Sequence, residues 1–291
     1  MIATWWTEPG LPASQNEDWF GLVDMPDGGV TILVLDGGTA RTETGCSHGV
    51  AWYSRQLGAS LQSELLNDPQ ISLVQALSAS IAAVAALHAD TCDLNHPGTP
   101  GAAVGIVRPI GTRTWEYAVL GDVTAVLDTP GSPTVIADTR ISASARLERD
   151  EADRWPIGAP EKNAAMVAMK HTELAERNQS YWIAAADPTA AQHALTGQAT
   201  DVARLAVLTD GAARACTFGL MDWEELLQLL DQDGPRKLVQ AVRHAENADP
   251  AGTRWARNKK SDDATVVYAK DRPANLSNTP LGRVQLKAFL R

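Results

Sequence analysis

Acidic residues stand at the ends of several apolar segments of the sequence. Four motifs share this placement: NED at residues 16–18, LDGG at 35–38, TDG at 209–211 and SDDAT at 261–265. A fifth motif, LGDV at 120–123, is similar. Carboxylates that gather in one place repel one another unless a cation neutralises them. The pattern therefore indicates a cation site built from the ends of several strands.

The ligand types favour a hard divalent cation. Oxygen donors suit Mg²⁺ or Mn²⁺. The sequence has no HExxH motif, and its three cysteines, Cys46, Cys92 and Cys216, form no CxxC pair. We therefore expect reduced thiols, no Cys/His cluster and no zinc. An aspartate–glycine pair is also a common turn, so any one of these motifs taken alone is a turn more often than a metal ligand.

Composition and charge exclude several classes of function. The chain has 291 residues, is 44% hydrophobic and 21% charged, and carries a formal net charge of -10, which is typical of a globular protein without a nucleic-acid partner. The nucleotide signatures GxGxxG and GxxxxGK[ST] and the nucleophile motif GxSxG are absent. The sequence shows no secretory leader and no apolar run long enough to span a bilayer, so we expect a cytoplasmic protein with no membrane partner.

Strands and helices must hold the acidic motifs in place. Residues 19–24 and 30–36 flank a Pro-Asp-Gly-Gly turn, which predicts a β-hairpin. We expect helices at 50–66, 71–89, 141–156, 188–195, 222–234 and 235–248, and further strands at 102–110, 115–128, 133–138, 204–208 and 264–270. This order suits an α+β sandwich rather than a repeated βαβ unit.

The five acidic motifs, in this order, resemble the metal-dependent protein phosphatase family, the PPM-type or type 2C phosphatases. The resemblance covers about residues 8–270, and the chain is similar in pattern to single-domain bacterial members. It implies a four-layer α-β-β-α sandwich with two central, mostly antiparallel sheets. It also implies a catalytic domain at 1–270, followed by a tail of unknown order at 271–291.

The same resemblance implies an activity. The enzyme would hydrolyse phosphoserine and phosphothreonine in proteins with a metal-activated water at a binuclear Mg or Mn centre. A third, weaker ion is expected in addition. The implied partners are a phosphorylated protein and a cognate serine/threonine kinase in bacterial signalling, and the protein is expected to be a monomer.

The resemblance assigns roles to the residues of the two N-terminal motifs. Asp36 would bridge both metals, and Gly37 would give its backbone carbonyl to one of them. Glu17 would hold that same metal, directly or through water. Asp18 would orient the metal-bound water, so Asp18 and Asp36 are the expected catalytic residues.

The later motifs complete the expected ligand set. Asp210 and Asp262 would ligate the second metal. Asp122 would join Asp210 at the third, weaker metal. Asp263 stands where the family usually has asparagine and is not expected to be a ligand.

Several positions depart from the family pattern. Ala13 stands where many relatives have a phosphate-binding arginine, and Arg41 is the candidate to replace it. Gly38 stands where some relatives have a histidine that acts as a general acid. Residues 148–162 lie where relatives carry a mobile flap beside the metals. His48, in the loop after LDGG, is interpreted as a loop residue without a metal role.

These departures leave three alternatives to an active protein phosphatase. The chain could be a pseudophosphatase, that is, a binding or regulatory module with the fold but little turnover. It could hydrolyse small phosphorylated molecules at the same centre. It could also be a structural domain in which the acidic motifs are turns.

Overall fold

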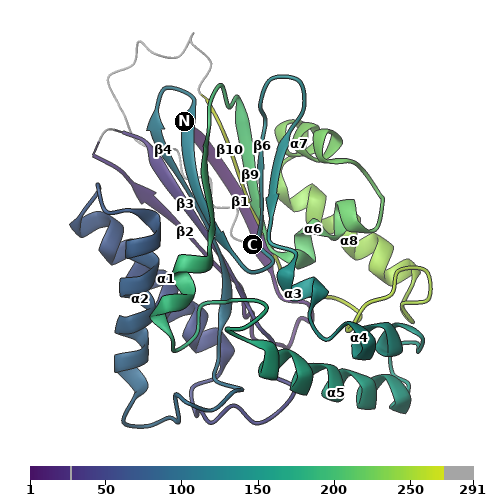
Figure 1. The fold of residues 1–291 in the computed structure, drawn as a ribbon. Helices are drawn as coiled ribbons and strands as arrows, with labels where there is room; N and C mark the ends of the chain where they lie inside the picture. The colour runs from purple at the N-terminus through teal and green to yellow at the C-terminus, as the bar shows by residue number, and fades with distance from the viewer. Residues whose placement is uncertain (27, 272–291) are drawn as a thin grey trace.

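Two antiparallel five-stranded sheets lie face to face at the centre of the structure (Figure 1). The computed structural model describes residues 1–26 and 28–271. The first sheet has the order β2-β3-β4-β5-β8, and its strands are β2 (Trp19–Asp24), β3 (Val30–Gly37), β4 (Ala102–Gly111), β5 (Thr114–Leu120) and β8 (Leu195–Ala199). The second has the order β1-β10-β9-β6-β7, and its strands are β1 (Ile2–Glu8), β10 (Ala264–Lys270), β9 (Arg204–Leu208), β6 (Thr124–Leu127) and β7 (Thr134–Ala137).

Helices cover the outer faces of both sheets and one end of the sandwich (Figure 1). On the first sheet lie α1 (Val50–Asn67), α2 (Leu73–His88) and the short 3₁₀ helix η1 (Pro188–His193). On the second sheet lie α6 (Asp210–Thr217), α7 (Trp223–Gln232) and α8 (Pro235–Ala248). The end of the sandwich is flanked by α3 (Arg140–Ala143), α4 (Arg146–Asp153) and α5 (Pro160–Glu176). The predicted α-β-β-α sandwich is therefore confirmed.

The buried strand β3 shows how the sequence builds these layers. Leu33 and Leu35 pack toward α1 and α2, whereas Ile32 and Val34 pack toward the second sheet. Successive side chains of a strand point to opposite faces, so a strand covered on both sides is apolar at every position. Asp36 follows Val34 by two residues and therefore lies on the face directed toward the second sheet.

The prediction of one strand over residues 115–128 is wrong. The chain leaves the first sheet after Leu120 and enters the second at Thr124, as β6. Gly121 makes the crossover with a φ of 79°, a left-handed conformation that favours glycine. A Cβ atom there would lie 2.7 Å from the Cβ of Ala103. The crossover places Asp122 between the two sheets, which the unbroken apolar pattern concealed.

The helix expected at 141–156 is also interrupted. Ser144 is extended and Ala145 is left-handed, with a φ of 46°, so the segment forms α3 and α4 separately. The sequence reading missed β1, β8, α5 and α6, and the segment expected as a helix at 188–195 is the 3₁₀ helix η1 followed by β8. The tail predicted at 271–291 lies outside the described residues, apart from Asp271. No helix within the described part of the chain combines the length and apolar character needed to cross a bilayer.

Candidate active site

An open pocket of about 170 Å³ lies at the end of the sandwich that α3, α4 and α5 flank. Five of the residues predicted for the site line it, namely Asp36, Gly37, Asp122, Asp210 and Asp262. They come from the end of β3, the crossover before β6, the start of α6 and the segment before β10. The structure thus brings together acidic motifs that are more than 200 residues apart in the sequence.

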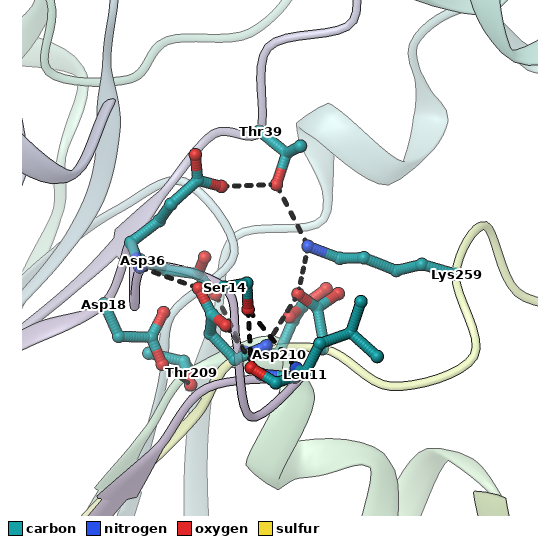
Figure 2. A network of polar contacts seen from close by, with 12 residues as sticks. Leu11, Ser14, Asp18, Asp36, Thr39, Thr209, Asp210 and Lys259 are labelled. Atoms are coloured by element: carbon teal, nitrogen blue, oxygen red, sulfur yellow. Dashed lines mark hydrogen bonds and ion pairs between the residues drawn. The ribbon is translucent and has the colours of Figure 1, made fainter. Parts of the chain in front are cut away.

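Asp36 and Asp210 are joined directly across the two sheets. The backbone N–H of Asp210 donates a hydrogen bond of 3.1 Å to Oδ2 of Asp36 (Figure 2). Asp210 is the first residue of α6, whose N-terminal N–H groups favour a nearby negative charge. Asp36 and Gly37 are still part of β3, and Asp210 begins a helix, so neither aspartate–glycine pair is a turn.

The NED motif reaches the same place from the loop before β2. Thr209 Oγ1 donates a 2.9 Å hydrogen bond to Asp18 Oδ2, and Thr39 Oγ1 donates one of 2.6 Å to Glu17 Oε2. The other oxygen of Asp18, Oδ1, is buried and has no hydrogen-bond partner among the described residues. A buried oxygen without a partner is unfavourable, so this atom calls for a ligand that the protein itself does not provide.

Close backbone packing explains the glycine of the LDGG motif. A Cβ atom on Gly37 would lie 2.6 Å from the carbonyl oxygen of Glu17 and 2.6 Å from Cγ1 of Val50. Only glycine lets the NED segment approach the end of β3 so closely. Gly37 therefore sets the distance between the two motifs.

Mutual repulsion dominates the electrostatics of the pocket. Burial raises the pKa of Asp36 well above its usual range, and the charges of Asp18, Asp210, Asp122 and Asp262 raise it further. Burial is also the main cause that raises the pKa of Asp210 to about 7. Protons or cations must therefore compensate the cluster near neutral pH. Its donors are all oxygens, which fits Mg²⁺ or Mn²⁺.

A lysine side chain already lies among these carboxylates. Lys259 Nζ forms an ion pair with Asp262 Oδ1 and donates a 3.0 Å hydrogen bond to Thr39 Oγ1 (Figure 2). Burial acts to lower the pKa of Lys259, but the carboxylates of Asp262, Asp210 and Asp36 raise it overall. The ammonium group thus marks the point where the structure already stabilises a positive charge.

Asp262 has a second cationic partner, Arg214, whose Nη2 lies 2.9 Å from Oδ2. The neighbouring Asp263 is used differently: its two oxygens accept hydrogen bonds of 2.7 Å from the backbone N–H groups of Gly10 and Glu17. Asp263 therefore holds the loop that carries the NED motif.

Basic residues form the rim of the pocket. Arg41 lines it, as the sequence suggested, and makes no hydrogen bond or ion pair with the residues that the structure describes. Arg149 and Lys170 also line it and pair with Glu173, at 2.6 and 3.5 Å. Sequence reasoning missed Lys170 and Glu173 because it did not predict α5. Lys259 belongs to no motif of the sequence, although it lies three residues before the candidate ligand Asp262.

The segment at 148–162, where relatives carry a flap, forms one part of the pocket wall. Among the lining residues, Arg149 belongs to this segment. The rest of this wall comes from α3 and from the last turns of α5, at Ile141, Ser142, Met169, Lys170 and Glu173. The wall therefore extends beyond residues 148–162 on both sides.

Comparison with solved structures identifies the fold. The serine/threonine phosphatase Stp1 from Staphylococcus aureus matches with a TM-score of 0.58 at 15% identity, over 94% of this chain and 96% of that chain. The S. agalactiae serine/threonine phosphatase matches with 0.58 at 16% identity, over 92% and 99%. The catalytic domain of the serine/threonine protein phosphatase PstP, solved with 2 manganese ions, matches with 0.50 at 16% identity, over 92% and 96%.

Sequence comparisons add nothing to this likeness, since no family model and no curated protein matches the chain. Identities of this size establish a shared architecture and leave the chemistry to the residues of the pocket. The chain has the fold of the bacterial serine/threonine phosphatases.

Proposed function

We propose that this protein is a metal-dependent serine/threonine phosphatase of the type 2C family, which removes phosphate from phosphoserine and phosphothreonine in proteins. The observation that carries the proposal is the convergence of Asp36, Asp122, Asp210 and Asp262 on one pocket with a basic rim. The shared fold supports it, and the raised pKa values of the buried aspartates support a need for cations.

Asp36 would contact both of two Mg²⁺ or Mn²⁺ ions, and the other oxygen ligands would be divided between the two ions. Glu17 and the carbonyl of Gly37 would complete one ion site, and Asp210 and Asp262 the other. Asp122 would add a third, weaker site together with Asp210. Bound there, divalent ions would activate a water molecule and neutralise charge on the phosphate.

The side chains of the protein supply the remaining steps. Asp18 Oδ1 would accept a hydrogen bond from the attacking water, and the hydroxyl of Thr209 fixes the orientation of that carboxylate by its bond to Oδ2. Arg41, which lines the pocket without a partner among the described residues, would bind the phosphate oxygens. Lys259 would have to release Asp262 Oδ1 when a cation binds there.

The rim favours an anionic substrate segment. Arg149 and Lys170 both pair with the single carboxylate of Glu173, so the group keeps a net positive charge. That charge is available for the phosphate of a substrate or for acidic residues next to the phosphorylated residue. We further propose a phosphoprotein as substrate, a cognate serine/threonine kinase as the opposing enzyme, a cytoplasmic location and a monomeric state.

Hydrolysis assays on the full chain test the proposal. An aryl phosphate and a phosphothreonine peptide are offered with Mn²⁺, with Mg²⁺ and with chelator, to the wild type and to Asp36→Asn. The matched control is Asp231→Asn, the same change at an aspartate that pairs with Lys270, in the α7 layer of the sandwich. We expect metal-dependent turnover of the peptide that Asp36→Asn lowers by at least about 10³-fold and that Asp231→Asn leaves unchanged.

The assay separates the alternatives. Turnover of the aryl phosphate alone would point to a small phosphorylated substrate. Manganese binding that Asp36→Asn weakens, without turnover of either substrate, would identify a pseudophosphatase. Neither turnover nor metal binding would show that the carboxylates have only a structural role.

A further inference from the structure

A second group of ligand side chains lies outside the carboxylate pocket. Cys46, His48, His88 and Cys92 place their ligand atoms all within 4.8 Å of one another. The expectation that the chain has no Cys/His cluster is therefore wrong. His48 lies in an exposed loop, as expected, but beside three other candidate ligands. The sequence concealed the group because its two halves are 40 residues apart and neither is a CxxC pair.

Local backbone structure explains how each half is formed. His88 is the last residue of α2, and the backbone N–H of Cys92 donates a 3.0 Å hydrogen bond to the carbonyl of His88. This extra helical turn puts the two side chains four residues apart on one side. Cys46 and His48 lie in the loop between β3 and α1, and the backbone N–H of Asp93 joins the halves by a 2.8 Å bond to the carbonyl of Gly45.

The distances suit a small tetrahedral ion. Cys46 Sγ lies 3.5 Å from Nδ1 of His88 and 3.6 Å from Nδ1 of His48, and Cys92 Sγ lies 3.3 Å from Nδ1 of His48. Bonds of about 2.0–2.3 Å in a tetrahedral zinc site separate the ligand atoms by roughly 3.3–3.8 Å. The two sulfur atoms lie 3.0 Å apart and would move apart to accept the ion.

The chemistry of the ligand atoms also suits a cation. Cys46 Sγ and Cys92 Sγ lie 3.0 Å apart, so two thiolates there would repel each other without a positive charge between them. One divalent ion balances two thiolates.

The two histidines differ in a way that fits a site with solvent access. His88 is 1% exposed, and its Nε2 has no hydrogen-bond partner among the described residues. His48 is exposed and stacks on Trp52, with ring centroids 4.3 Å apart. The buried histidine faces Cys46 through its Nδ1 and holds that ligand atom in place, and the exposed histidine gives an ion a route to the cluster.

We propose that Cys46, His48, His88 and Cys92 form a zinc site distinct from the carboxylate centre. Thiolate and imidazole ligands select zinc, whereas the all-oxygen pocket selects Mg²⁺ or Mn²⁺. With four protein ligands the site is closed, as in structural zinc sites. It fastens the loop that carries Thr39 and Arg41 at the pocket to the end of α2.

Metal analysis of the full chain tests the proposal. The protein is purified under reducing conditions without chelator, and its zinc content is measured by elemental mass spectrometry. The zinc is then replaced with Co²⁺, whose visible bands report tetrahedral geometry and whose near-ultraviolet band reports thiolate bonding. We expect about one zinc per chain and both cobalt signatures.

Variants locate the ion and keep the two metal centres separate. The paired change Cys46→Ser with Cys92→Ser should abolish the cobalt bands, whereas Cys216→Ser, at a cysteine outside the cluster, and Asp36→Asn should retain them. A loss of activity in Asp36→Asn therefore does not affect the zinc result. A loss of the cobalt bands in the paired serine variant likewise does not affect the test of the carboxylate centre.

Two results on the wild type overturn the proposal, and both are informative even if the paired serine variant does not fold. One is folded, reduced protein that holds no zinc and gives no tetrahedral cobalt spectrum. The other is a Cys46–Cys92 disulfide in protein purified without reductant that reforms after reduction and excludes zinc, which would assign the pair to redox chemistry.

Discussion

At the scale of single residues, the site is governed by one buried carboxylate that four others surround. Asp36 gains its raised pKa from burial and from the charges of Asp18, Asp210, Asp122 and Asp262. Such an arrangement is unfavourable in itself and becomes stable only when protons or cations enter it. Two predictions follow from this balance.

The first concerns pH and manganese affinity. The pKa of Asp210 is raised to about 7, so protons compete with the metal below that pH. Isothermal calorimetry between about pH 6 and 8 should show Mn²⁺ binding that tightens as pH rises, by up to tenfold per unit for one displaced proton, and that levels off above 7. If the Mn²⁺ affinity did not change over this pH range, the assignment of Asp210 as a ligand would be contradicted.

The same shift has a consequence for the metal-free fold. The unfolded chain loses its aspartate protons near pH 4, whereas folded Asp210 keeps its proton up to about 7. The folded state therefore binds more protons between these values, and the stability of chelated protein falls as pH rises through this window. Saturating Mn²⁺ should remove this dependence of the unfolding free energy on pH, which denaturant unfolding at several pH values measures.

The second prediction concerns Lys259. Its ammonium group neutralises Asp262 from within the pocket, so it competes with a metal ion for the same oxygen. Lys259→Met should tighten Mn²⁺ binding by roughly three- to tenfold, the range expected for loss of one largely buried ion pair. The control is Lys260→Met, because Lys260 is an exposed neighbour with the same charge. Weaker binding in Lys259→Met would mean that the lysine instead holds Asp262 in its binding position.

Sequence reasoning was effective for the acidic residues and weak for the basic ones. Carboxylates at the ends of apolar strands are a recognisable pattern, because burial at that position makes little sense without a counter-charge. Lys170 and Arg149 carry no such pattern, since basic residues on a helix are ordinary surface residues until the helix is placed. Arg41 was found only because an expected arginine was missing at Ala13.

At the scale of elements, the crossover from β5 to β6 is the feature that completes the pocket. Gly121 allows the chain to change sheets and leaves Asp122 at the pocket wall. The sequence could not reveal this change, because β5 and β6 are both apolar and a single glycine also fits a bulge within one strand. The zinc-type cluster was hidden for a related reason, since α2 must end at His88 before Cys92 can turn toward Cys46.

A matched pair of glycines tests the crossover. Gly121→Ala combines a left-handed backbone with a contact of 2.7 Å to Ala103, whereas Gly131 has a φ of 96° and nothing within 4 Å of the added Cβ. Denaturant unfolding should show a loss of about 2–4 kcal/mol for Gly121→Ala and about 1 kcal/mol for Gly131→Ala. Equal losses in the two variants would show that the close packing against Ala103 contributes nothing.

At the scale of the whole molecule, the layered architecture was predictable and the order of the strands was not. The continuous burial of β3, whose successive side chains face opposite sides, and the apolar helices α1 and α2 require a sheet with one face covered by helices and the other by a second sheet. Strand order depends on long-range pairing, which one sequence does not encode in any local pattern. The edge position of β1 beside β10 is the clearest example.

That pairing also determines when the candidate site is completed during synthesis of the chain. β10, near the end of the described chain, lies between β1 and β9 in its sheet, and Asp262 lies two residues before it. A nascent chain that emerges from the ribosome therefore holds β1 and β9 apart until residues 264–270 arrive. Because the pairing with β1 spans almost the whole chain, folding is expected to finish late and slowly. The candidate site is thus incomplete in the unfinished polypeptide, because Asp262 reaches it only when β10 joins the second sheet.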